Sequence, residues 1–193
     1  MRWARDGFTA SVVATVAASL GSPGPKRSKH RVLRDGSTVE LRPLEADDVD
    51  RLRRLFFRLS PHTVYLRFFQ PIHEPRTAQL QHLAAVDHCL RDAIAAVDAD
   101  GEVIAVARYD RSADDPTRAE VAVLVEDAWQ GRGLGLVVLR ELAHVAARRG
   151  ISEFSASVLG ENRRMLLLAR AINPATSYAF DQGEWELTIP LAS

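Results

Sequence analysis

Residues 119–149 read AEVAVLVEDAWQGRGLGLVVLRELAHVAARR, and this stretch decides the fold. Its first eight residues place three valines on one face and Glu120 on the other, an alternation that predicts a strand carrying a carboxylate. Three glycines follow at alternate positions, Gly131, Gly133 and Gly135, and the apolar residues after them recur at helical spacing. The sequence therefore predicts a strand, a glycine-rich loop and a long helix, in that order.

The glycine-rich loop is predicted to bind an anionic cofactor. Glycines let the backbone turn sharply and expose its N–H groups, and the positive end of the following helix dipole lies at the same point. Such an arrangement binds phosphate or pyrophosphate. Two familiar phosphate loops do not fit, because no Lys-Ser/Thr pair follows the glycines and the dinucleotide fingerprint would need a glycine at Leu136. An ordinary strand-to-helix turn is the alternative.

Residues 130–135, QGRGLG, resemble the [Q/R]-x-x-G-x-[G/A] pyrophosphate loop of the GNAT superfamily of CoA-dependent N-acyltransferases. The acidic strand before the loop and the helix after it occur in the same order. A second segment, LSPHTVYLRFF at residues 59–69, resembles the region after the first helix in bacterial protein-lysine acetyltransferases of this superfamily. There the segment lies beside the acceptor groove. The resemblance covers roughly Val32 to Leu191.

The resemblance implies which residues bind acetyl-CoA. The loop residues are Gln130, Gly131, Arg132, Gly133, Leu134 and Gly135. Backbone N–H groups of Leu124 or Val125 would hold the thioester carbonyl as negative charge develops on it. Asn162 corresponds to an Asn that often hydrogen-bonds the pantetheine arm of CoA, although Asn is also a favoured helix N-cap.

Glu120 is the predicted general base. A lysine amine with a pKa of ~10.4 is almost wholly protonated at neutral pH, so a proton must leave before the amine can attack. The resemblance places a catalytic Glu at this strand position, and partial burial would raise its pKa and make it a better base. The alternative is a surface-facing strand glutamate. Glu126 is the second candidate, although its charge would repel an anionic cofactor.

Two positions depart from the superfamily. Many relatives carry a Tyr seven residues after the Asn, proposed to protonate the departing CoA thiolate, and this position is Ala169 here. The Gly-Phe that usually ends the same helix is replaced by Ile172-Asn173. Tyr178 on the next predicted strand is the one alternative nearby. The sequence therefore leaves the general acid open.

Composition limits the other functions. The chain has 193 residues, of which 47% are apolar and 26% charged, as expected for one soluble globular domain. Its formal net charge of zero predicts no general attraction to nucleic acid or membranes. Cys89 is the only cysteine, and the histidines lack the H-x-x-x-H spacing of zinc enzymes, so no metal is expected. We expect a cytoplasmic protein, and the sequence leaves open whether it is a monomer or a homodimer.

Residues 1–31 are expected to form a flexible N-terminal extension and a basic linker, followed by the domain at residues 32–193. The apolar run from Thr9 to Leu20 follows Arg2 and Arg5, which is one feature of a secretory signal, but Asp6 does not fit that interpretation. The run is also shorter than the ~20 residues that span a bilayer. A loose extension, or a start codon placed upstream of the true one, is the preferred hypothesis.

The remaining elements follow from periodicity and turn residues. Helices are predicted at Val49–Leu59, after Ser60-Pro61, at Glu74–Ala84, Leu134–Arg149 and Arg163–Ala171. Strands are predicted in a hairpin at residues 32–44 and at Asp92–Val97, Glu102–Arg108, Ala119–Glu126, Ile151–Val158, Thr176–Asp181 and Glu184–Leu191. The expected fold class is α/β (α+β), a single GNAT domain whose mixed, mostly antiparallel, twisted sheet of about six or seven strands is flanked by about four or five helices.

The function that these features imply is acetyl-CoA-dependent N-acetylation of a primary amine. A protein lysine is the favoured acceptor, attacked directly in a ternary complex. A small amine, such as an antibiotic, polyamine or amino acid, is the second possibility. A non-catalytic acyl-CoA-binding regulatory module is the third, suggested by the missing Tyr and disfavoured by the presence of Glu120. The sequence does not identify the acceptor, because variable loops build that pocket.

Overall fold

One sheet runs through the molecule in the computed structural model, which describes residues 28–191. Its eight strands lie in the order β1-β2-β3-β4-β5-β6-β8-β7, and all neighbours are antiparallel except β5 and β6. The strands are β1 (Lys29–Val32), β2 (Thr38–Pro43), β3 (Arg91–Val97), β4 (Val103–Arg111), β5 (Arg118–Val125), β6 (Glu153–Leu159), β7 (Ser177–Asp181) and β8 (Glu184–Pro190). The predicted fold class is confirmed, with one strand more than expected.

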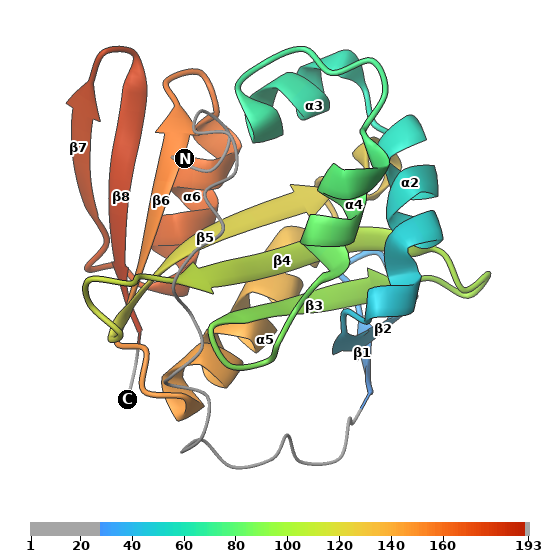
Figure 1. Cartoon of the computed structure of the whole chain (residues 1–193), viewed down its shortest axis with the longest axis horizontal. Coiled ribbons are helices and arrows are strands. Elements are labelled where there is room, and N and C mark those ends of the chain that lie inside the picture. The colour runs from blue at the N-terminus through green and yellow to red at the C-terminus, as the bar shows by residue number, and fades with distance from the viewer. Residues whose placement is uncertain (1–27, 192–193) are drawn as a thin grey trace.

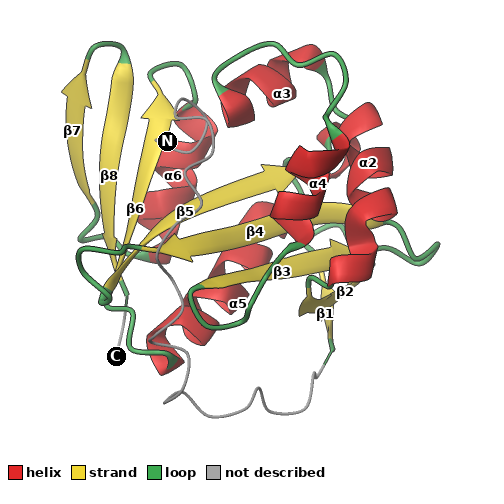
Figure 2. Cartoon of the chain, viewed as in Figure 1, coloured by secondary structure: helices red, strands yellow, loops and turns green. Residues whose placement is uncertain are grey.

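Helices cover both faces of the sheet (Figures 1 and 2). They are α2 (Val49–Phe57), α3 (Pro61–Phe68), α4 (Thr77–Ala84), α5 (Leu134–Arg148) and α6 (Arg163–Ile172), with short 3-10 turns η1 (Ala46–Asp48) and η2 (Asp127–Trp129). Helices α5 and α6 pack on one face, over a core that includes Val121 of β5. Helices α2 and α4 pack on the other face, where Leu124 of β5 contacts their core. The predicted alternation along β5 thus separates two cores.

Local sequence explains where the helices near the site begin. Ser60 caps α3, because its Oγ accepts a hydrogen bond from the Thr63 N–H at 3.2 Å and Pro61 occupies the first helical position. Helix α4 begins at Thr77 and not at the predicted Glu74. The physical reason is Pro75, since the residue before a proline disfavours helical backbone angles.

Strand β1 includes Lys29, His30 and Arg31, which were expected to belong to the basic linker. Lys29 Nζ lies 2.5 Å from a carboxylate oxygen of Glu141 on α5, and Arg31 lies 3.8 Å from the other oxygen. These three residues therefore belong to the sheet, and a helix carboxylate pairs with Lys29 and Arg31 there. The hypotheses on the run from Thr9 to Leu20 fall outside the described residues, and the domain boundary stays a prediction.

The two parallel strands β5 and β6 separate soon after they meet. Their pairing covers only three residues of β5, from Arg118 opposite Glu153 to Glu120 opposite Ser155. Beyond this point β6 continues against β8, while β5 continues against β4 (Figure 1). The split leaves one edge of β5 open over residues 121–125, and this opening positions the candidate site.

Candidate active site

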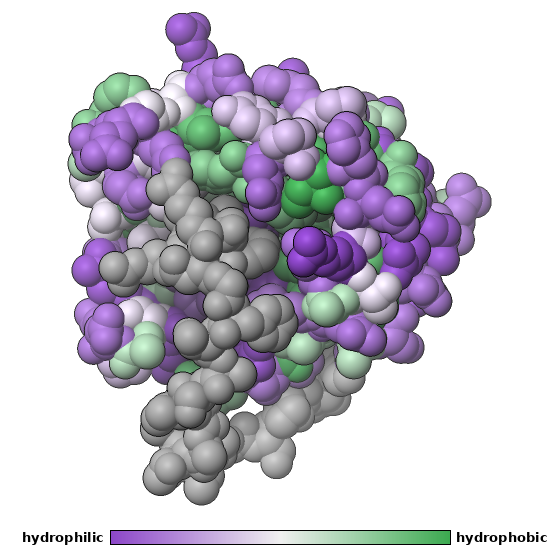
Figure 3. Space-filling model, turned by 45° about the horizontal axis from the view of Figure 1, so that its top comes forward, coloured by the Kyte–Doolittle hydropathy of each residue, from purple (hydrophilic) through white to green (hydrophobic). Residues whose placement is uncertain are grey.

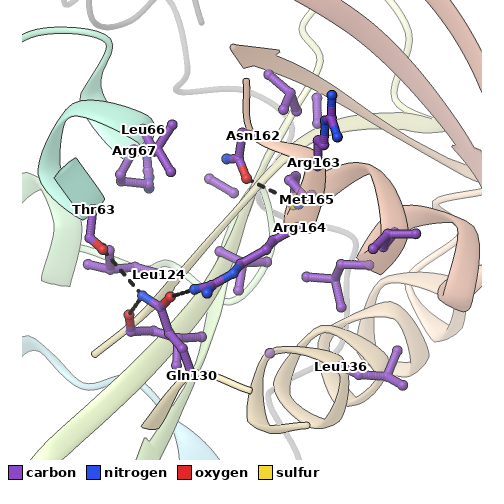
Figure 4. Close-up of a pocket in the computed structure, with 18 of the residues that line it drawn as sticks. Thr63, Leu66, Arg67, Leu124, Gln130, Leu136, Asn162, Arg163, Arg164 and Met165 are labelled. Atoms are coloured by element: carbon purple, nitrogen blue, oxygen red, sulfur yellow. Dashed lines mark hydrogen bonds between the residues drawn. The ribbon is translucent and has the colours of Figure 1, made fainter. Parts of the chain in front are cut away.

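A cleft of about 890 Å³ occupies the opening between β5 and β6. Residues 121–125 of β5 and 156–158 of β6 line its walls, and α3, the glycine-rich loop and the start of α6 complete it (Figure 4). The surrounding surface is largely hydrophilic, with patches of apolar residues on the face shown in Figure 3. A volume of this size suits an organic cofactor, since ligand pockets span ~300–1,000 Å³.

The glycine-rich loop lies at the floor of this cleft and leads into α5. Gly131 and Gly133 have φ angles of 77° and 89°, the left-handed region that glycine adopts without strain. Gly135 lies in the first turn of α5, and a Cβ there would meet Leu168 and Val125 at 3.6 Å, an ordinary contact distance. Within the described chain no side chain caps α5, so the N–H groups of its first turn are left for a ligand.

The Gln130 side chain joins three elements around the cleft (Figure 4). Its Nε2 donates to Thr63 Oγ1 of α3 at 3.2 Å and to the Val125 carbonyl of β5 at 3.1 Å. Its Oε1 accepts from Arg164 of α6. The loop is thereby fixed to both walls of the cleft. Sequence reasoning assigned Gln130 to the cofactor and missed these links, because both helices lie far from it in the chain.

Helix α3 is tied to the same loop at its first turn. Ser60 donates from its N–H and its hydroxyl to the Asp127 carboxylate at 2.9 and 2.8 Å, and Thr63 Oγ1 donates to it at 2.8 Å. Burial by itself would raise the pKa of Asp127, but the hydrogen bonds from Ser60 and Thr63 outweigh it and hold the pKa below its usual value. The carboxylate is therefore charged when it anchors α3.

Arg132 does not line the cleft with its side chain. Its guanidinium pairs with Asp35 at 3.0 Å and stacks over the Trp129 ring, 4.8 Å from the centroid. Besides Arg67 of α3, three arginines line the cleft: Arg34 from the β1–β2 turn, and Arg163 and Arg164 from the start of α6. Sequence reasoning missed these three, since nothing in their local pattern marks them as neighbours of the loop.

The strand register distinguishes the two backbone amides proposed for the thioester carbonyl. The Glu126 N–H donates to the Ile104 carbonyl of β4 at 2.9 Å, so the alternating ladder directs the Leu124 N–H to β4 as well. The Val125 N–H lies on the opposite side, facing the opening. The Val125 carbonyl faces the same way, because it accepts the hydrogen bond from Gln130. Leu124 lines the cleft too.

Asn162 lines the cleft and caps α6 at the same time. Its Oδ1 accepts from the Met165 N–H at 3.1 Å, which leaves the amide Nδ2 outside the cap (Figure 4). Ala169, at the usual Tyr position, is fully buried. Tyr178 is not among the lining residues, and its hydroxyl donates to the Leu166 carbonyl at 3.4 Å. The structure thus brings no tyrosine to the cleft among residues 28–191.

Glu120 lies at the point where β5 and β6 separate, next to the cleft-lining Val121, and is not itself among the residues that line the cleft. It is half-buried and stands directly opposite Asp110 of β4. Burial raises its pKa, and the carboxylates of Asp110 and Glu186 add to this effect, while the positive charge of Arg67 opposes it. A carboxylate with a raised pKa can accept a proton near neutral pH.

Glu126, the second candidate base, lies elsewhere. Its carboxylate accepts from Arg58 Nε at 2.9 Å, and the residue is only 8% exposed. It is not among the residues that line the cleft. The Glu126 carboxylate is therefore committed to Arg58 and holds the start of η2 against α2.

Two buried arginines, one on α3 and one on β4, escaped the sequence analysis. Arg67 of α3 is 8% exposed and Arg108 of β4 is 5% exposed, and Arg108 pairs with Asp110 at 3.0 Å. The sequence did contain a signal for each. Arg108 lies within the apolar run VIAVARYD, and Arg67 lies four residues after Thr63, on the same helix face.

Within residues 28–191 no three His, Cys, Asp or Glu side chains gather in a way that could hold a metal ion. The expectation of a metal-free enzyme stays a prediction. A search of the same residues for helices long and apolar enough to cross a membrane finds none.

Comparison with known proteins agrees with this geometry. The family model of the Acetyltransferase (GNAT) family matches residues 52–171. The acetyltransferase PA5475 of Pseudomonas aeruginosa is 36% identical over 143 residues, which cover 72% of this chain and 76% of that protein. The acetyltransferase Pat of Mycolicibacterium smegmatis is 37% identical over 134 residues, 69% of this chain and 40% of that longer protein. The solved GNAT domain of S. lividans PAT is 35% identical, with a TM-score of 0.78 over 85% of this chain and 97% of its own.

Proposed function

The chain belongs to the GNAT family of acetyl-CoA-dependent N-acetyltransferases, and from this premise we propose that it acetylates protein lysines by direct attack of the amine, in the cytoplasm. One observation carries the proposal. The cleft lies where β5 and β6 separate, the glycine-rich loop follows the C-terminal end of β5, and Glu120 directly precedes Val121, the first residue of β5 that lines the cleft. A single strand thus links a phosphate-binding loop to a carboxylate of raised pKa.

The residues of the cleft fit CoA. Gly131 and Gly133 take backbone angles that expose N–H groups, and a Cβ on Gly131 would meet nothing within 4 Å, so the space above the loop is open. These amides and the start of α5 would hold the pyrophosphate. Arg34, Arg163 and Arg164 supply positive charge along the same cleft. Asn162 would bind the pantetheine arm through Nδ2.

Acetyl-CoA, when bound, supplies an activated acetyl group as a thioester. The Val125 N–H faces the opening and would hold the carbonyl oxygen as negative charge develops. Glu120 accepts a proton from the lysine ammonium, so that the amine gains a lone pair. A C–N bond then forms, the thioester C–S bond breaks, and the nitrogen releases its second proton to solvent. Solvent provides the proton for the departing sulfur, because Ala169 offers no acid.

One feature supports a protein lysine over a small amine. Residues 59–69 resemble the acceptor-side segment of protein-lysine acetyltransferases, and they form α3 and its cap beside the cleft. Small-amine acetylation is the second candidate, because the same base and loop serve any primary amine.

Thiol release from acetyl-CoA, measured over a panel of lysine peptides, candidate proteins, polyamines, amino acids and aminoglycosides, tests the proposal. We expect turnover with protein or peptide lysines, confirmed by the mass of the acetylated product. Turnover with small amines alone would replace the proposal with the second candidate. Tight acetyl-CoA binding in a calorimeter without turnover on any acceptor would identify a regulatory module.

A further inference from the structure

Helix α3 forms one wall of the cleft but contributes no residue to the two cores of the described chain. Val64 is its one buried apolar residue, and the Phe68 ring lies 6.3 Å from that of Phe56 on α2. The helix has only eight residues, and helices shorter than ~12–15 residues are marginal in water without tertiary contacts. The position of α3 therefore depends strongly on its polar contacts.

These polar contacts converge on one carboxylate. Ser60 and Thr63 place three donors on the Asp127 side chain at 2.8–2.9 Å, and Asp127 begins η2, which precedes the glycine-rich loop. Thr63 Oγ1 also accepts from Nε2 of Gln130, the first residue of that loop, at 3.2 Å. A hydroxyl that donates to a carboxylate accepts a further hydrogen bond more strongly, so Gln130, Thr63 and Asp127 form one polarised chain. We call Asp127 and its bonds to Ser60 and Thr63 the α3 anchor.

The α3 anchor belongs to the segment that is proposed to hold the cofactor. Asp127 and Gln130 both line the cleft. Gly131 and Gly133 follow directly, with the positive φ angles that expose loop N–H groups. Figure 4 shows the Gln130 side chain between the loop and Thr63 of α3. A phosphate bound to the loop N–H groups restricts the loop and, through these hydrogen bonds, the first turn of α3.

We propose that Asp127 is a positioning residue that couples the cofactor loop to α3: acetyl-CoA bound at the loop restrains the α3 anchor and thereby fixes the α3 wall of the cleft. Coupling between two sites is reciprocal, so an acceptor that holds α3 also strengthens the binding of acetyl-CoA. The inference rests on the proposed cofactor site. It gives Asp127 a role in ordering the cleft in addition to its contact with the N-terminus of α3.

Hydrogen exchange of residues 59–69, followed by mass spectrometry with and without saturating acetyl-CoA, tests the coupling. In the unmodified protein acetyl-CoA should slow this exchange about fivefold or more, since coupling between sites is typically ~5–150-fold. D127N keeps the shape of the side chain but removes its charge and one of its two acceptor oxygens. It should lose most of the slowing while acetyl-CoA still binds in a calorimeter. A merely structural Asp127 would speed the exchange equally with and without acetyl-CoA and leave the ratio of the two rates unchanged.

D87N is the matched control. One oxygen of Asp87 accepts from the three N–H groups of residues 89–91 at 2.7–2.9 Å, and this side chain does not line the cleft. Its hydrogen bonds resemble those of Asp127 in number and length, but they hold the turn before β3. D87N should lose stability and keep the slowing of α3 exchange by acetyl-CoA.

S60A/T63V is the second variant, because it removes both hydroxyls and leaves Asp127 in place. It should also lose most of the slowing. The inference is overturned by full slowing in folded D127N or S60A/T63V, or by no slowing in unmodified protein that binds acetyl-CoA. Failure of both variants to fold would overturn it too, because the α3 anchor would then be structural. By contrast, an unmodified protein that does not bind acetyl-CoA would overturn the proposed cofactor site itself, so the two failures are distinguishable.

Discussion

The proposed cofactor half of the site centres on one continuous stretch, residues 125–135, to which Arg34 and the start of α6 add side chains, whereas the proposed acceptor half comes from α3, β4, β5 and β8. The first half uses backbone: two glycines at positive φ and the amides that begin α5. The second half uses side chains, namely Glu120 among Asp110, Arg108, Glu186 and Arg67. A site built from backbone groups tolerates side-chain substitutions that are compatible with its φ angles. In a cluster of charged side chains, each change of charge alters the pKa values of its neighbours. The two halves should therefore respond to mutation in different ways.

The largest expected effect is on the acceptor half. Glu120→Gln removes the base and should lower kcat by ~10²–10⁴-fold, the usual contribution of general base catalysis, while acetyl-CoA binding is kept. A rise in pH should restore part of the rate, since solvent then supplies the free amine. Steady-state kinetics and calorimetry measure the two quantities. Glu126→Gln is the matched control, because Glu126 pairs with Arg58 outside the cleft. This substitution should leave the acid limb of the pH profile of kcat/KM in place. Loss of CoA binding in E120Q would make Glu120 structural.

A smaller effect is expected at the cofactor loop. Gly133 has φ of 89°, so Gly133→Val strains the backbone and should cost ~1–3 kcal/mol of unfolding free energy, although an added Cβ would make only ordinary contacts with Arg34, the nearest at 3.5 Å. Displaced amides should also weaken acetyl-CoA binding about tenfold or more, since bonds to a charged group contribute ~1.5–3 kcal/mol.

Gly150→Val separates these two effects of the Gly133 substitution. Gly150 has a similar φ of 79° at the other end of α5. Both variants should lose stability in thermal unfolding, but only G133V should lose affinity in a titration. Equal affinity of folded G133V and the unmodified protein would remove the loop from the site.

The smallest effect is expected at Gly135, which completes the same motif. Its backbone is not in the left-handed region, and an added Cβ would make ordinary contacts at 3.6 Å. Gly135→Ala should therefore change stability by less than ~0.5 kcal/mol and leave the acetyl-CoA affinity close to that of the unmodified protein. A large loss in either measurement would mean that the loop depends on close packing as well as on backbone geometry.

The sequence by itself determined the local parts. The alternation from Ala119 to Glu126 predicted β5 and its two faces, the spacing of Gly131 and Gly133 predicted a turn before α5, and Ser60-Pro61 predicted the start of α3. Each of these depends on interactions between residues close in the chain, and such interactions can be read from periodicity and φ preference. One local prediction was wrong, because the helix expected from Glu74 begins at Thr77. Pro75 is the reason, since the residue before a proline disfavours helical backbone angles.

Only the tertiary structure decided which distant residues meet. The separation of β5 from β6 after Glu120 opens the cleft, and no local pattern encodes where two parallel strands part. The strand register turned the Val125 N–H toward the opening and the Leu124 N–H toward β4. Packing of α3 brought Arg67 to the cleft, and the pairing with Asp35 took the Arg132 side chain out of it. The physical reason is that pairing and burial are contacts across the whole chain, while the sequence pattern records only neighbours.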